Sequence, residues 1–309
     1  MPPPSPASSG KTMLIYRGHS DKVFSVHWSP DGRSIASGGR DASVHIWNPG
    51  SGQSSMIYRA HPSCVLCVAW SPDGRLLASG DTSGTIHVWE AQTGQTLSIY
   101  RGHRRFVRSL AWSPEGQYIA SGGDYGDSTV QIWEALSGIR LASHSDQYRV
   151  FAVCWLPGGQ RIASASFDGT VMLRDVHSGS PGTTSRIYAD HNAPVYALCC
   201  SPDGRYLASG GQDRSIRVWD ALTLKTARIY REHDQAIKTL AWSPDGQFIA
   251  SGGDDTSIQV WRAATGECRC AYYDHTAWIR ALAWSHNGMS IASASDATVR
   301  VWQPQYATA

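Results

Sequence analysis

Serine, histidine and aspartate recur together along this 309-residue chain, and they are the three residue types of a hydrolase triad. In such a triad, histidine takes the proton of the serine nucleophile and aspartate orients the histidine. An enzyme needs one such set at one pocket, whereas here the set returns many times at a nearly constant interval. No GxSxG, HExxH, P-loop or GxGxxG motif stands in a suitable context. We therefore expect a protein that is not an enzyme and that uses no cofactor and no metal.

Each recurrence has four slots, occupied mainly by histidine, serine, aspartate and tryptophan. The histidine slot holds His19, His61, His103, His191, His233 and His275. The serine slot holds Ser37, Ser79, Ser121, Ser164, Ser209, Ser251 and Ser293. The aspartate slot holds Asp41, Asp127, Asp168, Asp213, Asp255 and Asp296. The tryptophan slot holds Trp47, Trp89, Trp133, Trp219, Trp261 and Trp302. A buried indole N–H needs an acceptor and a buried carboxylate needs donors, so hydrogen bonds among the four would satisfy both.

The repeat length points to the elements that position these residues. With Arg174 counted in the fourth tryptophan slot, successive slots are 42, 44, 41, 45, 42 and 41 residues apart. A period near 42 is typical of a propeller blade with four strands. In the first copy the segments VFSVHW, SIASGG, VHIW and SSMIY are β-branched or aromatic and are separated by turn residues. No segment has a helical apolar period, so we predict an all-β protein.

The two ends of the chain predict how the ring closes. The sequence TVRVWQPQ near the C-terminus is the third strand of a seventh copy, and TMLIY near the N-terminus matches the fourth strands. We therefore expect residues 12–16 to complete the blade formed by residues 276–303. The prediction is one seven-bladed β-propeller of four-stranded antiparallel blades over residues 11–309. Residues 1–10 are expected to form a disordered Pro/Ser tail or linker.

These features resemble the WD-repeat β-propeller family, with the highly regular repeats of its bacterial members, over residues 11–303. Only Trp219-Asp220 is a literal WD pair. The resemblance implies that each blade bonds Asp to His, His to Ser, and Ser to the indole N–H. It also implies that the loop before the first strand and the loop between strands two and three open on one face, where partners commonly bind.

Two copies depart from the pattern. The second has Ser83 where aspartate is expected, and the fourth has Asp146 in the histidine slot and Arg174 in the tryptophan slot. We expect Arg174 to form an ion pair with Asp146 or Asp168, because guanidinium binds carboxylate in fork geometry. The alternative is a looser and wetter blade in which His144 takes part.

Residues that do not recur are the candidates for function. The predicted partner-binding aromatics are Phe24, Phe106, Phe151, Phe167, Tyr196 and Trp278. The predicted partner-binding cations are Lys22, Arg40, Arg108, Arg149, Lys238 and Arg280. Aromatic and arginine anchors dominate many interfaces. Acidic residues cluster in copies five to seven, so we expect a protein or peptide partner, acidic or phosphorylated, lying toward blades one to four. Alternatively, the aromatics plug the channel and the cations solvate its rim.

Composition limits the other function classes. A net charge of +2 disfavours nucleic-acid binding. The sequence has no signal peptide and no apolar run long enough for a membrane span. Seven cysteines, an odd number within predicted strands, favour a reducing compartment and hence the cytoplasm. We expect a monomeric interaction scaffold; the alternatives are a sensor module of a larger signalling protein, such as a kinase-linked one, or a propeller that binds a small ligand.

Overall fold

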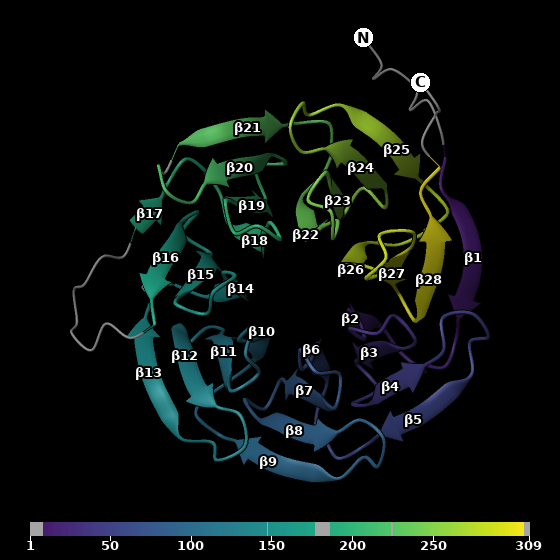
Figure 1. The fold of residues 1–309 in the computed structure, drawn as a ribbon, viewed down its shortest axis with the longest axis vertical. Helices are drawn as coiled ribbons and strands as arrows, with labels where there is room; N and C mark the ends of the chain where they lie inside the picture. The colour runs from purple at the N-terminus through teal and green to yellow at the C-terminus, as the bar shows by residue number, and fades with distance from the viewer. Residues whose placement is uncertain (1–8, 147, 177–185, 224, 306–309) are drawn as a thin grey trace.

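The computed structural model describes residues 9–146, 148–176, 186–223 and 225–305, which form 28 β-strands. They are arranged as seven four-stranded antiparallel sheets in a ring (Figure 1). The described residues contain no helix, and thus no helical segment that could cross a bilayer. The predicted all-β, seven-bladed propeller is confirmed.

Blades one to six each contain four consecutive strands, with the first strand innermost and the last outermost (Figure 1). Blade one is β2 (Val23–Trp28), β3 (Ile35–Gly39), β4 (Val44–Trp47) and β5 (Ser54–Tyr58). Blade two is β6 (Val65–Trp70), β7 (Leu76–Asp81), β8 (Ile86–Glu90) and β9 (Thr96–Tyr100). Blade three is β10 (Val107–Trp112), β11 (Tyr118–Gly123), β12 (Thr129–Glu134) and β13 (Arg140–Ser145). Blade four is β14 (Val150–Trp155), β15 (Arg161–Ser166), β16 (Val171–Asp175) and β17 (Arg186–Tyr188).

The remaining three blades follow the same plan. Blade five is β18 (Val195–Cys200), β19 (Tyr206–Gly211), β20 (Ile216–Asp220) and β21 (Thr226–Tyr230). Blade six is β22 (Ile237–Trp242), β23 (Phe248–Gly253), β24 (Ile258–Arg262) and β25 (Cys268–Tyr272). Blade seven is β26 (Ile279–Trp284), β27 (Ile291–Ser295), β28 (Thr298–Gln303) and, from the other end of the chain, β1 (Lys11–Tyr16).

Strand β1 closes the ring, as predicted, by pairing antiparallel with β28. The register places Lys11 opposite Gln303 and Tyr16 opposite Val299. Of the expected tail, residues 1–8 lie outside the described residues. Ser9 forms a parallel bridge with Ala271 of blade six, so its backbone is tied to the ring.

The core lies between adjacent blades. The ring of Tyr16 stacks on that of Trp47 with centroids 4.3 Å apart. Trp28 reaches back to blade seven, where its Nε1 donates to the Ala283 carbonyl at 3.1 Å. Each apolar layer is therefore shared by two blades, and no blade buries its own faces alone.

Strand direction assigns the connecting loops to two faces. Because the four strands of a blade alternate in direction, the loop before the innermost strand and the loop between strands two and three lie at the same end of the blade. We call this end of the ring the partner face. The tight SPDG turns lie on the opposite face, where Gly32 takes a φ of 70° and Ser29 Oγ donates to Asp31 at 2.6 Å.

Candidate partner-binding face

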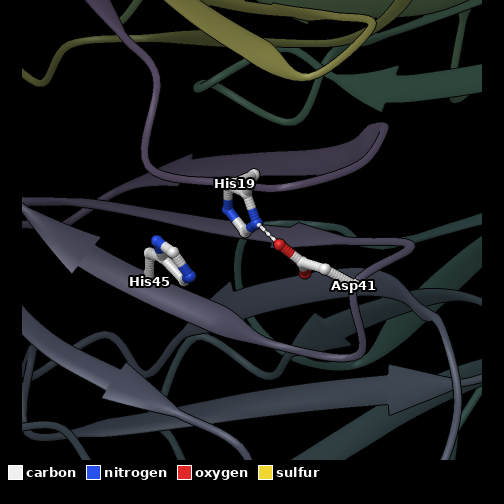
Figure 2. A group of neighbouring side chains, drawn as sticks. All are labelled: His19, Asp41 and His45. Carbon is white, nitrogen blue, oxygen red and sulfur yellow. Dashed lines mark hydrogen bonds and ion pairs between the residues drawn. The ribbon is translucent and has the colours of Figure 1, made fainter.

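The hydrogen-bond set of blade one joins two loops of the partner face to the sheet (Figure 2). His19, in the loop before β2, points its Nδ1 at Asp41 Oδ2 over 2.8 Å, and its Nε2 lies 2.9 Å from Ser37 Oγ. Trp47 Nε1 donates to the same serine oxygen at 3.1 Å. Ser37 is 0% exposed, so its hydroxyl is unavailable to a substrate and serves the fold.

Blades three and five contain the full set as well. The contacts join His103, Ser121, Asp127 and Trp133 in blade three, and His191, Ser209, Asp213 and Trp219 in blade five, at 2.5 to 3.2 Å. In blade six, His233 bonds Asp255 at 2.6 Å and Ser251 at 2.7 Å. There the Trp261 indole nitrogen is buried without a hydrogen-bond partner.

Blade two supplies its carboxylate from a position that the sequence analysis missed. Ser83 stands where the repeat predicts aspartate, but Asp81, the last residue of β7, takes that role. Asp81 Oδ2 lies 2.9 Å from His61 Nδ1, and His61 Nε2 lies 2.6 Å from Ser79 Oγ. Ser83 instead donates its hydroxyl to Asp81 at 2.6 Å. The set is complete, because Trp89 donates to Ser79 at 3.1 Å.

Blade four has a buried arginine–aspartate ion pair in place of the Asp–His–Ser–Trp hydrogen-bond set. Arg174 extends from β16, donates to Ser164 Oγ at 2.6 Å, and pairs with the carboxylate of Asp146. The side chains of Arg174 and Asp146 are 5% and 3% exposed, so the pair is buried. Burial raises the pKa of Asp146, and the Arg174 charge opposes that rise.

The other residues expected to contribute to blade four lie outside this pair. Asp168 accepts from the backbone and the hydroxyl of Thr170, at 2.9 and 2.7 Å, and so stabilises its own turn. His144 Nε2 is buried and has no hydrogen-bond partner. The structure therefore contains the Arg174–Asp146 pair rather than a set built on Asp168 or His144.

Blade seven also differs from the prediction. His275 Nε2 bonds Ser293 at 2.7 Å, but the described contacts of His275 do not include Asp296. Asp296 comes three residues after the blade serine, whereas Asp41 comes four residues after Ser37. This shorter turn leaves the Asp296 side chain exposed on the partner face, and its carbonyl accepts from Val23 N at 2.6 Å.

His19, Asp41 and His45 form the one group of potential metal ligands found among the described residues (Figure 2). Their candidate ligand atoms are already engaged. His45 Nδ1 bonds Tyr16 Oη at 2.7 Å and its Nε2 lies 3.0 Å from Ser43 Oγ, while both His19 nitrogens serve the blade set. Burial, and then the charge of His19, lowers the pKa of His45 to about 4. All four imidazole nitrogens of His19 and His45 are therefore engaged in hydrogen bonds.

Seven predicted partner-binding residues form an arc of connected side chains on the partner face. Arg108 binds Asp124 at 2.5 Å, and Arg149 approaches the same carboxylate at 3.3 Å. Phe106 lies beneath the Arg108 guanidinium, with the ring centroid 5.3 Å away. The guanidinium of Arg149 lies 5.5 Å from the centroid of the Phe167 ring, which continues the arc into blade four.

The arc continues from blade four to blade six through aromatic contacts. The ring centroid of Phe151 lies 6.3 Å from that of Phe167 and 5.0 Å from that of Tyr196. Lys238 places its ammonium 3.8 Å from the Tyr196 ring centroid and 3.3 Å from Asp254 Oδ2. We call this connected set of Phe106, Arg108, Arg149, Phe151, Phe167, Tyr196 and Lys238, with Asp124 and Asp254, the aromatic arc.

A second cluster lies across blades seven and one. Arg280 holds its guanidinium 5.3 Å from the Phe24 ring centroid and 5.7 Å from that of Trp278. Lys22, Trp278 and Arg280 line one cavity of about 340 Å³. Arg40 is separate: it is exposed and lies 3.7 Å from Asp21.

Several residues of this face were not identified from the sequence. Asp124 is buried and forms ion pairs with two arginines, and Tyr125 lies 5.2 Å from the Arg149 guanidinium. Tyr148 adds its ring to Phe167 at 6.5 Å. The signal was present, since Asp124 and Asp254 stand at the position where blade one has Arg40, three residues after the blade serine.

The repeated blades and their buried sets define a β-propeller whose variable residues gather on one face. The model of the family described as WD domain, G-beta repeat matches residues 10–48, 52–90, 94–134, 138–175, 182–220, 224–262 and 266–303. The chain therefore belongs to the WD40 repeat family.

Curated relatives match only part of this chain. A region is 33% identical over 103 residues to human WD repeat-containing protein 90, covering 32% of this chain and 6% of that protein. The target of rapamycin complex subunit wat1 of Schizosaccharomyces pombe is 33% identical over 96 residues, covering 30% of each chain. The guanine nucleotide-binding protein subunit beta of Arabidopsis thaliana is 31% identical over 100 residues, covering 31% of this chain and 26% of that protein. The matches thus span less than a third of these relatives.

Proposed function

We propose that this protein is a non-catalytic scaffold that binds a protein or peptide partner on the partner face, around the central axis of the ring. The similarity to WD40 proteins, which include a subunit of a complex and a G-protein subunit, supports a role in protein interaction. The blade serines and histidines are buried in structural hydrogen bonds, which argues against their use in catalysis.

Exposed aromatic rings beside cations, in the aromatic arc and in the Trp278 cluster, are the observation that carries the proposal. Trp278, Phe167 and Phe106 expose 52, 43 and 37% of their surface, although each contacts a neighbouring cation. Rigid aromatic rings beside arginine are the residues that contribute most to binding energy at interfaces. Exposed rings that are already held in place lose little side-chain entropy when a partner covers them.

The proposal also covers the cellular compartment and the oligomeric state of the protein. All seven cysteines are free, which supports a reducing compartment such as the cytoplasm. In the closed ring each blade packs against a neighbour on both sides. The ring therefore needs no second chain to cover a blade, which supports a monomer.

Affinity capture with face-specific variants tests the proposal. The bait is the wild-type chain or a Phe106→Ala/Phe151→Ala/Trp278→Ala variant. The control carries Leu136→Ala, Ile139→Ala and Met289→Ala, whose side chains are 60, 67 and 65% exposed and lie in loops of the opposite face. A protein captured by wild type is then purified and its binary affinity measured by calorimetry.

We expect the partner-face variant to bind the purified partner at least tenfold more weakly, and the opposite-face control to bind within twofold of wild type. Equal binding by all three chains would place the partner elsewhere and refute the proposal. Thermal unfolding of each variant shows whether the fold is retained.

A further inference from the structure

The cavity between blades six, seven and one is lined by two cations that form no ion pair within the described residues. It is lined by Lys22, Thr256, Thr276, Ala277, Trp278, Arg280 and Asp296. Its volume of about 340 Å³ is at the lower end of the ~300–1,000 Å³ of ligand pockets. It therefore has room for one side chain and its adjoining backbone.

Four of the six predicted partner-face cations are paired with carboxylates. Arg40 pairs with Asp21, Arg108 and Arg149 with Asp124, and Lys238 with Asp254. Among the described residues, Lys22 and Arg280 have no carboxylate oxygen within 4 Å. These two residues line the same cavity, so the uncompensated cations of the set are concentrated there. The unpaired charge therefore favours a position for an acidic partner at blades six, seven and one, rather than toward blades one to four as the sequence predicts.

The cavity is also preorganised. The Arg280 guanidinium contacts the rings of both Phe24 and Trp278, which restrict it without neutralising its charge. Trp278 is 52% exposed, and it is the one tryptophan of thirteen that fills no recurring slot. A cation held against aromatic faces keeps its donors free for an incoming oxyanion.

Asp296 limits the charge that the cavity can accept. The lining contains two cations and one carboxylate, so its formal charge is +1. A carboxylate carries one negative charge, whereas a phosphoryl group carries about −1.5 to −2 at pH 7. Repulsion from Asp296 therefore costs a phosphoryl group more than it costs a carboxylate.

We propose that this cavity binds the carboxylate of an aspartate or glutamate side chain in a partner peptide. The proposal rests on the proposed scaffold function and assigns one contact within it. Lys22 and Arg280 donate to the carboxylate, Trp278 packs against its methylene groups, and Asp296 selects against phosphorylated residues.

Fluorine NMR of protein labelled with 5-fluorotryptophan tests the assignment directly. The Trp278 resonance is identified by its loss in Trp278→Phe. The probes are end-capped Gly-Gly-X-Gly peptides in which X is glutamate, glutamine or phosphoserine. The other twelve tryptophan resonances report whether the fold is unchanged.

The glutamate peptide is expected to shift the Trp278 resonance saturably, and the glutamine peptide to leave it unchanged at the same concentrations. Lys22→Gln and Arg280→Gln should each weaken glutamate binding at least fivefold. The control Arg33→Gln, which removes an exposed cation of the opposite face, should leave it unchanged. Asp296→Asn keeps a residue that tolerates the positive φ of 51° at this position, and it should raise phosphoserine-peptide affinity at least fivefold.

Equal shifts with glutamate and glutamine, no shift with glutamate, or tighter binding of phosphoserine to the wild-type chain would each overturn the proposal. Its failure is distinguishable from that of the scaffold function. If a captured partner is lost with the triple alanine variant but binds Lys22→Gln/Arg280→Gln normally, the scaffold stands and the carboxylate contact does not. If the triple variant binds as wild type, the scaffold function itself fails.

Discussion

Arg174 fills the slot that tryptophan fills in the other six blades, and its guanidinium binds Asp146, which fills the histidine slot of the same blade. Both side chains are almost fully buried. A buried ion pair is costly to desolvate, so it contributes little net stability, but removing one partner leaves an uncompensated charge. Blade four is therefore more sensitive to single than to double substitution.

Arg174→Trp alone is expected to lower the free energy of unfolding by about 3–5 kcal/mol, because Asp146 is left buried and unpaired. Asp146→His/Arg174→Trp restores the residues of the regular set and should recover most of that loss. Urea unfolding of the three chains measures both effects. An unchanged or raised stability of Arg174→Trp would show that the pair has no structural importance.

We predict that an aspartate two residues later can replace Asp81, provided that position 81 then has the glycine that blade one has there. Asp81→Gly removes the acceptor of His61 and should cost about 2–4 kcal/mol, since a buried donor loses its charged partner. Asp81→Gly/Ser83→Asp restores the Ser-Gly-Gly-x-Asp pattern of blade one and should restore stability. Thermal unfolding decides the question: a double variant no more stable than Asp81→Gly would mean that the carboxylate acts only from position 81.

Three buried histidines predict a loss of stability in mild acid. Burial, the first cause in each case, lowers the pKa of His45 and His87 to about 4 and that of His275 to about 3. These histidines are neutral in the fold, but the unfolded chain binds a proton below pH 6.5. Stability is therefore complete above pH 6.5 and falls as the pH drops from 6.5 toward 4, by about 2 kcal/mol per histidine at pH 5.

His45→Gln is the matched test, because blade three holds Gln131 in the same place and bonds it to Tyr100 at 2.6 Å. The variant should lose less stability than wild type between pH 7 and pH 5, as measured by urea unfolding at each pH. The aspartates do not mask the effect, because Asp41 and Asp81 have pKa values below the ordinary range, and their titration lies below this window. Identical pH profiles for the two chains would contradict the prediction.

Asp124 and Asp254 occupy the same position in blades three and six but have different surroundings. Asp124 binds two arginines, whereas Asp254 has one lysine contact and a buried Oδ1 without a hydrogen-bond partner. Asp124→Asn should lower the free energy of unfolding by about 1–3 kcal/mol, and Asp254→Asn should change it by less than about 1 kcal/mol. Chemical unfolding of both single variants provides the comparison, and equal losses would refute the difference drawn from the contacts.

The strand order and ring closure could be predicted because a 42-residue period and a matching fourth strand at the N-terminus are visible in the sequence. The bonded sets of blades one, three and five could be predicted for the same reason. Asp81 and Asp296 could not, because the direction of a turn side chain depends on the number of residues between it and the strand. The aromatic arc required the structure, since Phe151 and Tyr196 are 45 residues apart in sequence, and only the ring brings their side chains together.

The pairing of β1 with β28 has a consequence for synthesis on the ribosome. Tyr16 is translated 283 residues before its partner Val299. Until then β1 has an open edge, and its Tyr16 ring must stack on Trp47 of blade one without the sheet to which β1 will belong. Exposed strand edges promote association with other chains. Closure of blade seven is therefore the folding step at which nascent chains of this protein exchange strands with one another most readily.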